Sequence, residues 1–248
     1  MLDYDKLELL KLLLQSGGDA RERPWIHSAI TRGRSIKHIQ VLIDAGADLR
    51  ATDKDGVSVY ALAQSHGRSD VLALLHGARI QEHLSEEERF VAACARGDEA
   101  EARTILAQVP EILSRLSDKQ LRAMPDLAWI QNHNAVRTML ALGWPREVKS
   151  GWGATALNMA VFQGDAEMAD LLLEHGADWR TPHGYGDNVV GTLSYASQAE
   201  DIDDGPARDC VGCARALITH GMPLPDSEHY TFSSEVTEYF DSLRLKAG

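Results

Sequence analysis

The stretch from His183 to Cys213 gathers the side chains of this 248-residue chain whose types and spacing could support catalysis or metal binding. Four aspartates stand within nine residues: Asp201, Asp203, Asp204 and Asp209. Close carboxylates shift each other's pKa, so that one can deliver a proton, and carboxylates can also ligate a hard cation. Cys210 and Cys213 follow at the C-x-x-C spacing of zinc and redox sites. The stretch is therefore a candidate acid–base or metal-assisted site, centred on residues 199–209.

For each of these kinds of site, the sequence lacks a feature that the site would need. The letters "DIDD" at residues 201–204 resemble the D-x-D-D acid of one class of terpene cyclases, whose barrel architecture is absent here. The same letters resemble a truncated calcium loop, without a glutamate at the twelfth position. Structural zinc needs four ligands, and no second cysteine pair exists. We therefore expect no catalytic residue, no metal and no cofactor, and an enzyme at the insertion 199–209 is the alternative hypothesis.

Composition narrows the class of protein further. The chain has 25 basic and 37 acidic residues, a net charge of −12, which opposes binding to a phosphate backbone and favours a partner with a basic surface. The apolar run "LELLKLLLQ" at residues 7–15 is far shorter than the ~20 apolar residues that span a bilayer. Three cysteines and no charged-then-apolar leader indicate the cytoplasm. We expect no nucleic acid and no membrane among the partners.

An internal repeat organises the whole chain. Small alanines recur at intervals of 34, 30, 35, 32 and 36 residues: Ala29, Ala63, Ala93, Ala128, Ala160 and Ala196. Four residues after five of them comes a glycine or asparagine that can end a helix in the left-handed conformation: Gly33, Gly67, Gly97, Asn132 and Gly164. An apolar pattern with helical spacing follows each stop. Each copy thus predicts two short antiparallel helices, which must stack on neighbouring pairs to bury their apolar faces.

These copies resemble the ankyrin repeat family, in divergent form. Its T-P-L-H-x-A motif is similar to "TALNMA" at residues 155–160 and to "WIHSA" at residues 25–29, and its G-A-D turn stands intact at residues 46–48 and 176–178. The resemblance implies an all-α ankyrin-type solenoid of about seven stacked helix-turn-helix units with short hairpin tips.

The expected organisation is a single ankyrin repeat domain, 1–248. Its successive parts are a partial repeat at 1–22, repeats at 23–52, 53–84, 85–117, 118–150 and 151–182, a last repeat with an insertion at 183–225, and a C-terminal capping helix at 226–248. The half repeat at the start also allows the chain to be a component of a longer protein. Cys213 takes a core position, and His27, His175 and His220 are expected to hydrogen-bond the backbone of adjoining turns.

The resemblance also implies where a partner binds, because ankyrin repeats generally use the hairpin tips and the exposed face of the first helix. Carried over by position, together with the tip aromatics and the acids of the insertion, the candidate partner-binding residues are Ile130, Gln131, Trp152, Phe162, Gln163, Tyr185, Asp201, Asp203 and Asp204. Two alternatives stay open: neighbouring loops cover Ile130 and Phe162, and the acidic insertion is merely solvated. We predict a monomeric protein–protein interaction scaffold.

Overall fold

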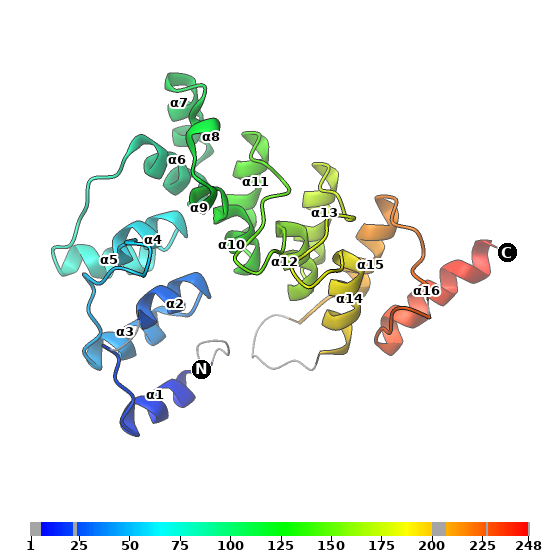
Figure 1. Cartoon of the computed structure of the whole chain (residues 1–248), viewed down its shortest axis with the longest axis horizontal. Coiled ribbons are helices and arrows are strands. Elements are labelled where there is room, and N and C mark those ends of the chain that lie inside the picture. Colours follow the sequence, from blue (N-terminus) through cyan, green and yellow to red (C-terminus); the bar gives the residue numbers. More distant parts are fainter. Residues whose placement is uncertain (1–5, 22–23, 200–206, 227, 248) are drawn as a thin grey trace. The chain divides into compact units, whose positions relative to one another are not determined.

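The computed structural model describes residues 6–21, 24–199, 207–226 and 228–247 (Figure 1). These residues form helices and turns and contain no β-strand, only an isolated antiparallel bridge between Thr52 and Ser58. The all-α class expected from the sequence is confirmed. The chain divides into two compact units, one up to Ala123 and one from Met124 onward. No helix among the residues described is both long and apolar enough to cross a membrane.

The first unit stacks three helix pairs after a single leading helix. Its helices are α1 (Leu7–Gln15), α2 (Trp25–Thr31), α3 (Ile36–Asp44), α4 (Val59–Ser65), α5 (Ser69–Gly77), α6 (Glu86–Ala95), α7 (Glu99–Gln108), α8 (Ile112–Arg115) and α9 (Asp118–Leu121). First helices contact first helices, α2 with α4 and α4 with α6, while α1, α3 and α5 form the second row. Each pair therefore buries its apolar face against the next pair, as a solenoid requires.

Small residues let the first helices of this unit approach one another. Ala29, Ala63 and Ala93 are fully buried at the positions that the repeat predicts. Gly67 follows α4 with a φ of +63°, and a Cβ there would lie 2.3 Å from the carbonyl oxygen of Ala95 in the next repeat. Only glycine fits this turn, because it combines a left-handed conformation with backbone contact.

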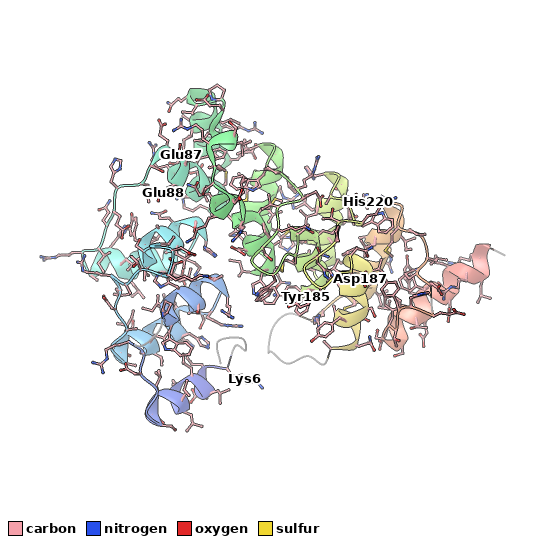
Figure 2. The ribbon with its side chains drawn as sticks, in the orientation of Figure 1. Lys6, Glu87, Glu88, Tyr185, Asp187 and His220 are labelled. Atoms are coloured by element: carbon pink, nitrogen blue, oxygen red, sulfur yellow. The ribbon has the colours of Figure 1, made fainter. Side chains whose placement is uncertain are left out.

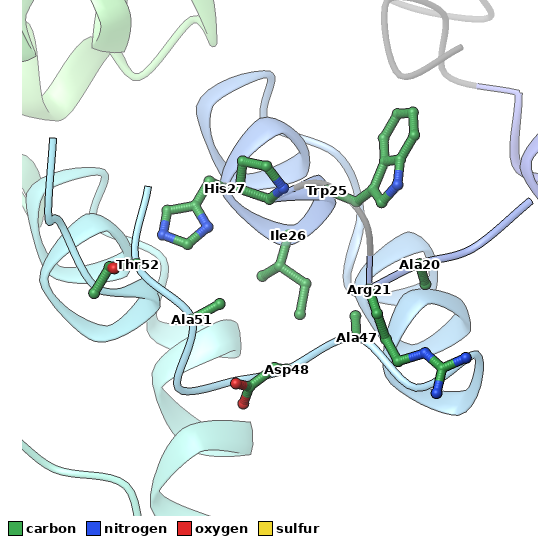
Figure 3. A pocket seen from close by; sticks show the side chains of 10 residues that line it. Ala20, Arg21, Trp25, Ile26, His27, Ala47, Asp48, Ala51 and Thr52 are labelled. Atoms are coloured by element: carbon green, nitrogen blue, oxygen red, sulfur yellow. The ribbon is translucent and has the colours of Figure 1, made fainter. Parts of the chain in front are cut away.

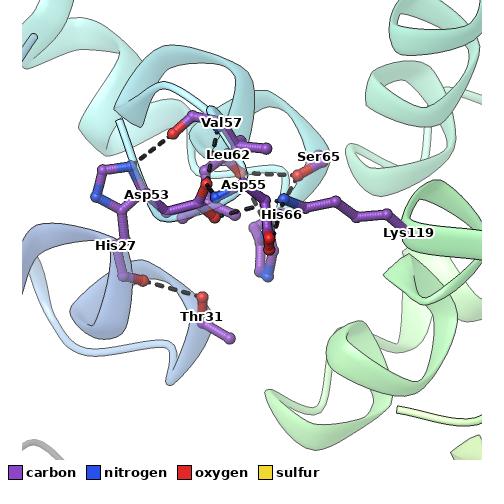
Figure 4. A network of polar contacts seen from close by, with 9 residues as sticks. All are labelled: His27, Thr31, Asp53, Asp55, Val57, Leu62, Ser65, His66 and Lys119. Atoms are coloured by element: carbon purple, nitrogen blue, oxygen red, sulfur yellow. Dashed lines mark hydrogen bonds and ion pairs between the residues drawn. The ribbon is translucent and has the colours of Figure 1, made fainter. Parts of the chain in front are cut away.

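A polar network joins the tips of this unit (Figure 4). His27 Nε2 lies 2.9 Å from the carbonyl oxygen of Val57 in the next tip, which confirms the backbone role expected for this histidine. Asp53 accepts hydrogen bonds from the backbone N–H groups of Val57 and Asp55, and Lys119 Nζ lies 3.5 Å from its carboxylate. Partial burial acts to raise the pKa of Asp53. The two backbone hydrogen bonds and Lys119 outweigh it, so the pKa of this carboxyl lies below its usual value.

His66, the residue that follows α4, lies in the same region. Its Nδ1 lies 3.0 Å from the Leu62 carbonyl oxygen and 3.1 Å from Ser65 Oγ, and its side chain is buried (Figure 4). Burial disfavours the imidazolium and lowers the pKa of His66 to about 4. The neutral ring is therefore part of the packing of α4.

The second unit repeats the arrangement and has one further helix after its last pair (Figure 1). Its helices are α10 (Ala123–Trp129), α11 (His133–Ala141), α12 (Ala156–Gln163), α13 (Ala166–Glu174), α14 (Val189–Gln198), α15 (Cys210–Thr219) and α16 (Ser234–Ala247). The helix α12 packs on α14, α13 packs on α11 and α15, and α16 covers α15. Val236 and Phe240 of α16 are buried.

The register of the α10–α11 pair differs from the expected one by one residue. The left-handed residue after α10 is Gln131, with a φ of +56°, and not Asn132. Asn132 instead caps α11, because its side chain accepts a hydrogen bond from the Ala135 N–H at 3.2 Å. The prediction of an asparagine stop was therefore wrong, and Trp129 takes the position that Phe162 holds in the next repeat.

Buried polar and sulfur-containing side chains fix the pairs of this unit. Asn158 donates from Nδ2 to Thr192 Oγ1 at 3.1 Å, which joins α12 to α14. Cys213 is fully buried, so its predicted core position is confirmed, and burial raises the pKa of its thiol. His175 Nδ1 lies 2.9 Å from the Leu171 carbonyl oxygen, as expected. For His220 the predicted hydrogen bond to the backbone was wrong, because its Nε2 lies 3.0 Å from a side-chain oxygen of Asp170 in the preceding repeat.

Candidate functional site

Three aromatic residues, spaced by 33 positions, form a ladder at the C-terminal ends of the first helices of the second unit. They are Trp129 of α10, Phe162 of α12 and Tyr195 of α14. The ring centroids of Trp129 and Phe162 lie 5.5 Å apart at an interplanar angle of 33°, and those of Phe162 and Tyr195 lie 5.8 Å apart at 18°. These separations are those of interacting aromatic pairs, so the aromatic ladder links three successive repeats.

Two further aromatic residues stand on the hairpin tips before α12 and α14. The Trp152 ring meets Trp129 edge-on at 5.3 Å, and the Tyr185 ring lies 5.9 Å from His183. Their tips pack backbone against backbone. A Cβ at Gly153, whose φ is +71°, would lie 2.8 Å from the Gly184 Cα, and a Cβ at Gly184 would lie 2.4 Å from the Trp152 carbonyl oxygen. Glycines at both places therefore set where the two tip aromatics stand.

The aromatic ladder and the tips enclose a concave groove of about 610 Å³. Its lining comprises Trp129, Trp152, Ala154, Asn158, Met159, Phe162, His183, Tyr185, Asp187, Gly191, Thr192 and Tyr195. The groove is mostly apolar, yet three of its aromatic side chains are largely exposed to solvent. The exposed fraction is 52% for Trp152, 84% for Tyr185 and 65% for Tyr195. We call these lining residues the aromatic groove. A concave surface of exposed aromatic side chains with a few polar groups is suited to hold a side chain or a peptide segment.

Asp187 is the carboxylate of the aromatic groove, on the segment that leads from Tyr185 into α14 (Figure 2). Its Oδ1 accepts hydrogen bonds from the Tyr230 hydroxyl at 3.0 Å and from the Asn188 N–H at 2.7 Å. Its Oδ2 faces Gly191, where a Cβ would lie 2.1 Å away. Partial burial and the bond to Asp187 raise the pKa of Tyr230. The position just before α14 suits a carboxylate, because the N-terminal end of a helix is positively polarised.

The acidic insertion ends against α12. The Asp209 N–H donates to the Gly164 carbonyl oxygen at 2.8 Å, and the Asp209 side chain caps α15 through the Gly212 N–H. Arg208 places its Cζ 5.7 Å from the Phe162 ring centroid and donates from Nη2 to the Phe162 carbonyl oxygen. A guanidinium of the chain itself therefore already lies on the aromatic ladder, although Arg208 is not among the residues that line the groove.

The structure brings together some of the residues predicted from the sequence. Trp152, Phe162 and Tyr185 line one groove. Ile130 and Gln131 do not line it. Gln163 does not line it either, and its Nε2 donates to the Trp129 carbonyl oxygen at 2.7 Å. Asp201, Asp203 and Asp204 lie outside the described residues.

Sequence reasoning missed Trp129, Tyr195 and Asp187. The first two carry a signal that could have found them, because residues 129, 162 and 195 are spaced by one repeat length. Asp187 carries none, since its role depends on Tyr230, 43 residues away.

A second cavity, in the first unit, is smaller (Figure 3). It measures about 220 Å³ and is lined by Trp25, Ile26, His27 and small residues of the neighbouring tip. Trp25 is already engaged there, because its Nε1 donates to the Asp19 carbonyl oxygen at 3.3 Å. The aromatic groove is the stronger candidate because it is larger and its aromatic side chains reach solvent.

In the part of the chain that the structure describes, no three His, Cys, Asp or Glu side chains come together where they could hold a metal ion. The greater part of the alternative enzyme site, residues 200–206, is outside the described ranges.

One segment of the chain matches the model of a known repeat family. Residues 152–182 match the family model of the ankyrin repeat. A crystal structure of the human ASB11 ankyrin repeat domain is similar with a TM-score of 0.39 and 18% identity, covering 90% of this chain and 96% of that chain. The crystal structure of the ankyrin repeat domain of Bcl-3, a member of the IkappaB protein family, is similar with a TM-score of 0.48 and 18% identity, covering 88% and 97%. A search of curated proteins gives no significant match. The matched segment includes Trp152, α12 with Phe162, and α13.

Proposed function

Because this chain contains an ankyrin repeat at residues 152–182, packed between helix pairs of the same kind, we propose that it is an interaction scaffold whose protein partner binds in the aromatic groove of its second unit. Ankyrin repeats are typically protein–protein interaction modules. The proposal includes the monomeric, cytoplasmic state expected from the sequence.

The observation that carries the proposal is the exposure of the aromatic side chains. Six large hydrophobic side chains are exposed in the described residues, and three of them, Trp152, Tyr185 and Tyr195, line this one groove. The other three are leucines of α1 and α16. Contiguous exposed apolar surface marks interaction sites, and rigid aromatics make efficient contacts because few rotamers are lost on binding.

The shape of the groove supports a peptide segment as the bound element. The aromatic ladder runs across three successive first helices, so a segment lying along it would meet one ring per repeat. Trp152 and Tyr185 stand on the tips at the rim. The acids of the insertion, as the sequence suggests, would speed association with a basic partner rather than supply most of the affinity.

The experiment that tests this function is selection of a phage-displayed random peptide library on the whole chain. Selected peptides are then measured against Trp152→Ala, Tyr195→Ala and the control Leu245→Ala. The control truncates a still more exposed apolar side chain on α16, outside the groove. We expect each groove variant to lose about 2 kcal/mol of binding free energy, roughly a thirtyfold weaker Kd. Peptides that bind all three variants like the parent would contradict the proposal.

A further inference from the structure

We infer that the partner inserts an arginine side chain into the aromatic groove, between the aromatic ladder and Asp187. This inference deepens the proposed function and rests on it. It names the chemistry that the groove recognises, which apolar lining alone does not specify.

The first support is the concentration of aromatic rings around one cavity. Trp129, Phe162 and Tyr195 succeed one another along the ladder, and Trp152 and Tyr185 stand at the rim of the same groove. The face of an aromatic ring is electronegative, so it attracts a cation lying within about 6 Å of its centroid. The attraction strengthens when the cation leaves water, and a groove with five aromatic side chains removes much of that water.

The second support is the guanidinium that the chain itself places on the ladder. Arg208 lies 5.7 Å from the Phe162 ring and donates to the carbonyl oxygen of the same residue. The ladder therefore already has one arginine contact of the kind that we assign to the partner.

The third support is the charge of the cavity wall. Asp187 Oδ1 has two hydrogen-bond donors, whereas Oδ2 has none within the described part of the chain. No ion pair to Asp187 forms among the described residues either. A carboxylate that lines a mostly apolar groove is costly when a ligand displaces its water, unless the ligand brings a compensating cation.

Arginine matches this combination better than lysine does. The guanidinium is planar and weakly hydrated, so it can stack on a ring while its donors reach a carboxylate. The ammonium of lysine is a strongly hydrated point charge, and it gains less from ring stacking. A neutral or acidic side chain would bring no cation to Asp187, whose Oδ1 has only the uncharged donors Tyr230 and Asn188.

The test uses capped glycine–serine peptides that carry one central arginine, citrulline, lysine or leucine. They are titrated into the isotope-labelled whole chain, and the indole N–H signals of Trp129 and Trp152 are followed by NMR. Citrulline has nearly the shape of arginine without its charge. We expect the arginine peptide to shift both signals, with a Kd about tenfold lower than that of the citrulline peptide.

Variants connect the preference to the proposed contacts. Asp187→Asn keeps the shape of the side chain and an oxygen for the Tyr230 hydroxyl, while it removes the charge and turns the other oxygen into an NH2 donor. We expect it to reduce the preference for arginine over citrulline to about threefold or less, as the rings alone would give. The control Leu245→Ala should keep the full preference. In peptides selected from the library, replacing arginine with citrulline should raise the Kd for the parent chain about tenfold, as in the glycine–serine peptides.

The outcomes separate this inference from the proposed function. Library peptides that need Trp152 and Tyr195 but bind equally well with citrulline or leucine in place of arginine would overturn the arginine assignment and leave the scaffold function standing. A lysine peptide that binds as tightly as the arginine peptide would overturn it as well. Selected peptides that ignore both groove variants would instead refute the proposed function.

Discussion

Replacing Phe162, the central ring of the aromatic ladder, tests whether ring contacts or mere apolar burial hold the groove together. Phe162→Leu keeps an apolar side chain but removes both ring pairs, with Trp129 and Tyr195, and the Arg208 contact. Aromatic pairs contribute about 0.5–1.5 kcal/mol each, and an exposed cation–π contact about 0.5–1 kcal/mol. Since Phe162 is only half-buried, we expect a loss of about 2 kcal/mol from the local stability of α12 for Leu. We expect about 3 kcal/mol for Phe162→Ala, which also loses apolar contact.

Hydrogen exchange is the appropriate assay, because it reads the opening free energy of α12 without assuming that the whole chain unfolds at once. The matched control is Phe232→Leu, which removes ring contacts with Tyr230 and Phe240 elsewhere in the same unit. Exchange should speed up in residues 156–163 for the Phe162 variants and near α16 for the control. If Phe162→Leu exchanges like the parent while Phe162→Ala does not, the ladder is only apolar packing and the reasoning from ring geometry is refuted.

Three further predictions concern buried polar groups. Burial lowers the pKa of His66 in the folded state to about 4, below the ordinary histidine value of about 6.5, so the unfolded state binds more protons between these pH values. Stability should therefore fall by up to about 3 kcal/mol as pH drops from 7 to 4, and pH-dependent urea unfolding that is unchanged by His66→Phe would contradict this. Burial raises the pKa of the Cys94 thiol to about 12 and also raises that of Cys213, so a thiol reagent at pH 8 should modify neither until denaturant is added. Mass spectrometry that finds either cysteine labelled in the native protein would contradict this prediction. Asn158→Ala should cost about 2 kcal/mol in thermal unfolding, because the buried Thr155 loses its acceptor; an unchanged Tm would mean that water replaces the amide.

The sequence predicted the parts of the fold that stacking dictates. A small residue must stand where first helices touch, and a residue that tolerates a positive φ must end them, so Ala29 and Gly67 could be placed from spacing alone. The rule failed at Gln131, which adopts a φ of +56° without being glycine or asparagine. Because a glutamine stands at this turn, the sequence predicts a register that is wrong by one residue. The predicted partner-binding residue is therefore Ile130 and not its neighbour Trp129.

The candidate site was predictable only where repeat position decides exposure. Trp152 and Tyr185 could be chosen because hairpin tips face solvent in any ankyrin-type stack, and Phe162 because of its place on the first helix. The role of Gln163 could not be foreseen, since its bond to the Trp129 carbonyl oxygen depends on side-chain reach between repeats. Asp187 depends likewise on a tertiary contact with Tyr230, which no local pattern encodes.

Site-specific photo-crosslinking in the native cells shows whether a partner protein occupies the aromatic groove. A benzophenone amino acid replaces Tyr195 in the groove or, as the control, Glu174 at the exposed end of α13, which contributes nothing to the lining. We expect a covalent adduct with one protein from position 195, lost when Trp152→Ala is added, and no such adduct from position 174. An adduct of equal yield from position 174, or one from position 195 that survives Trp152→Ala undiminished, would contradict it.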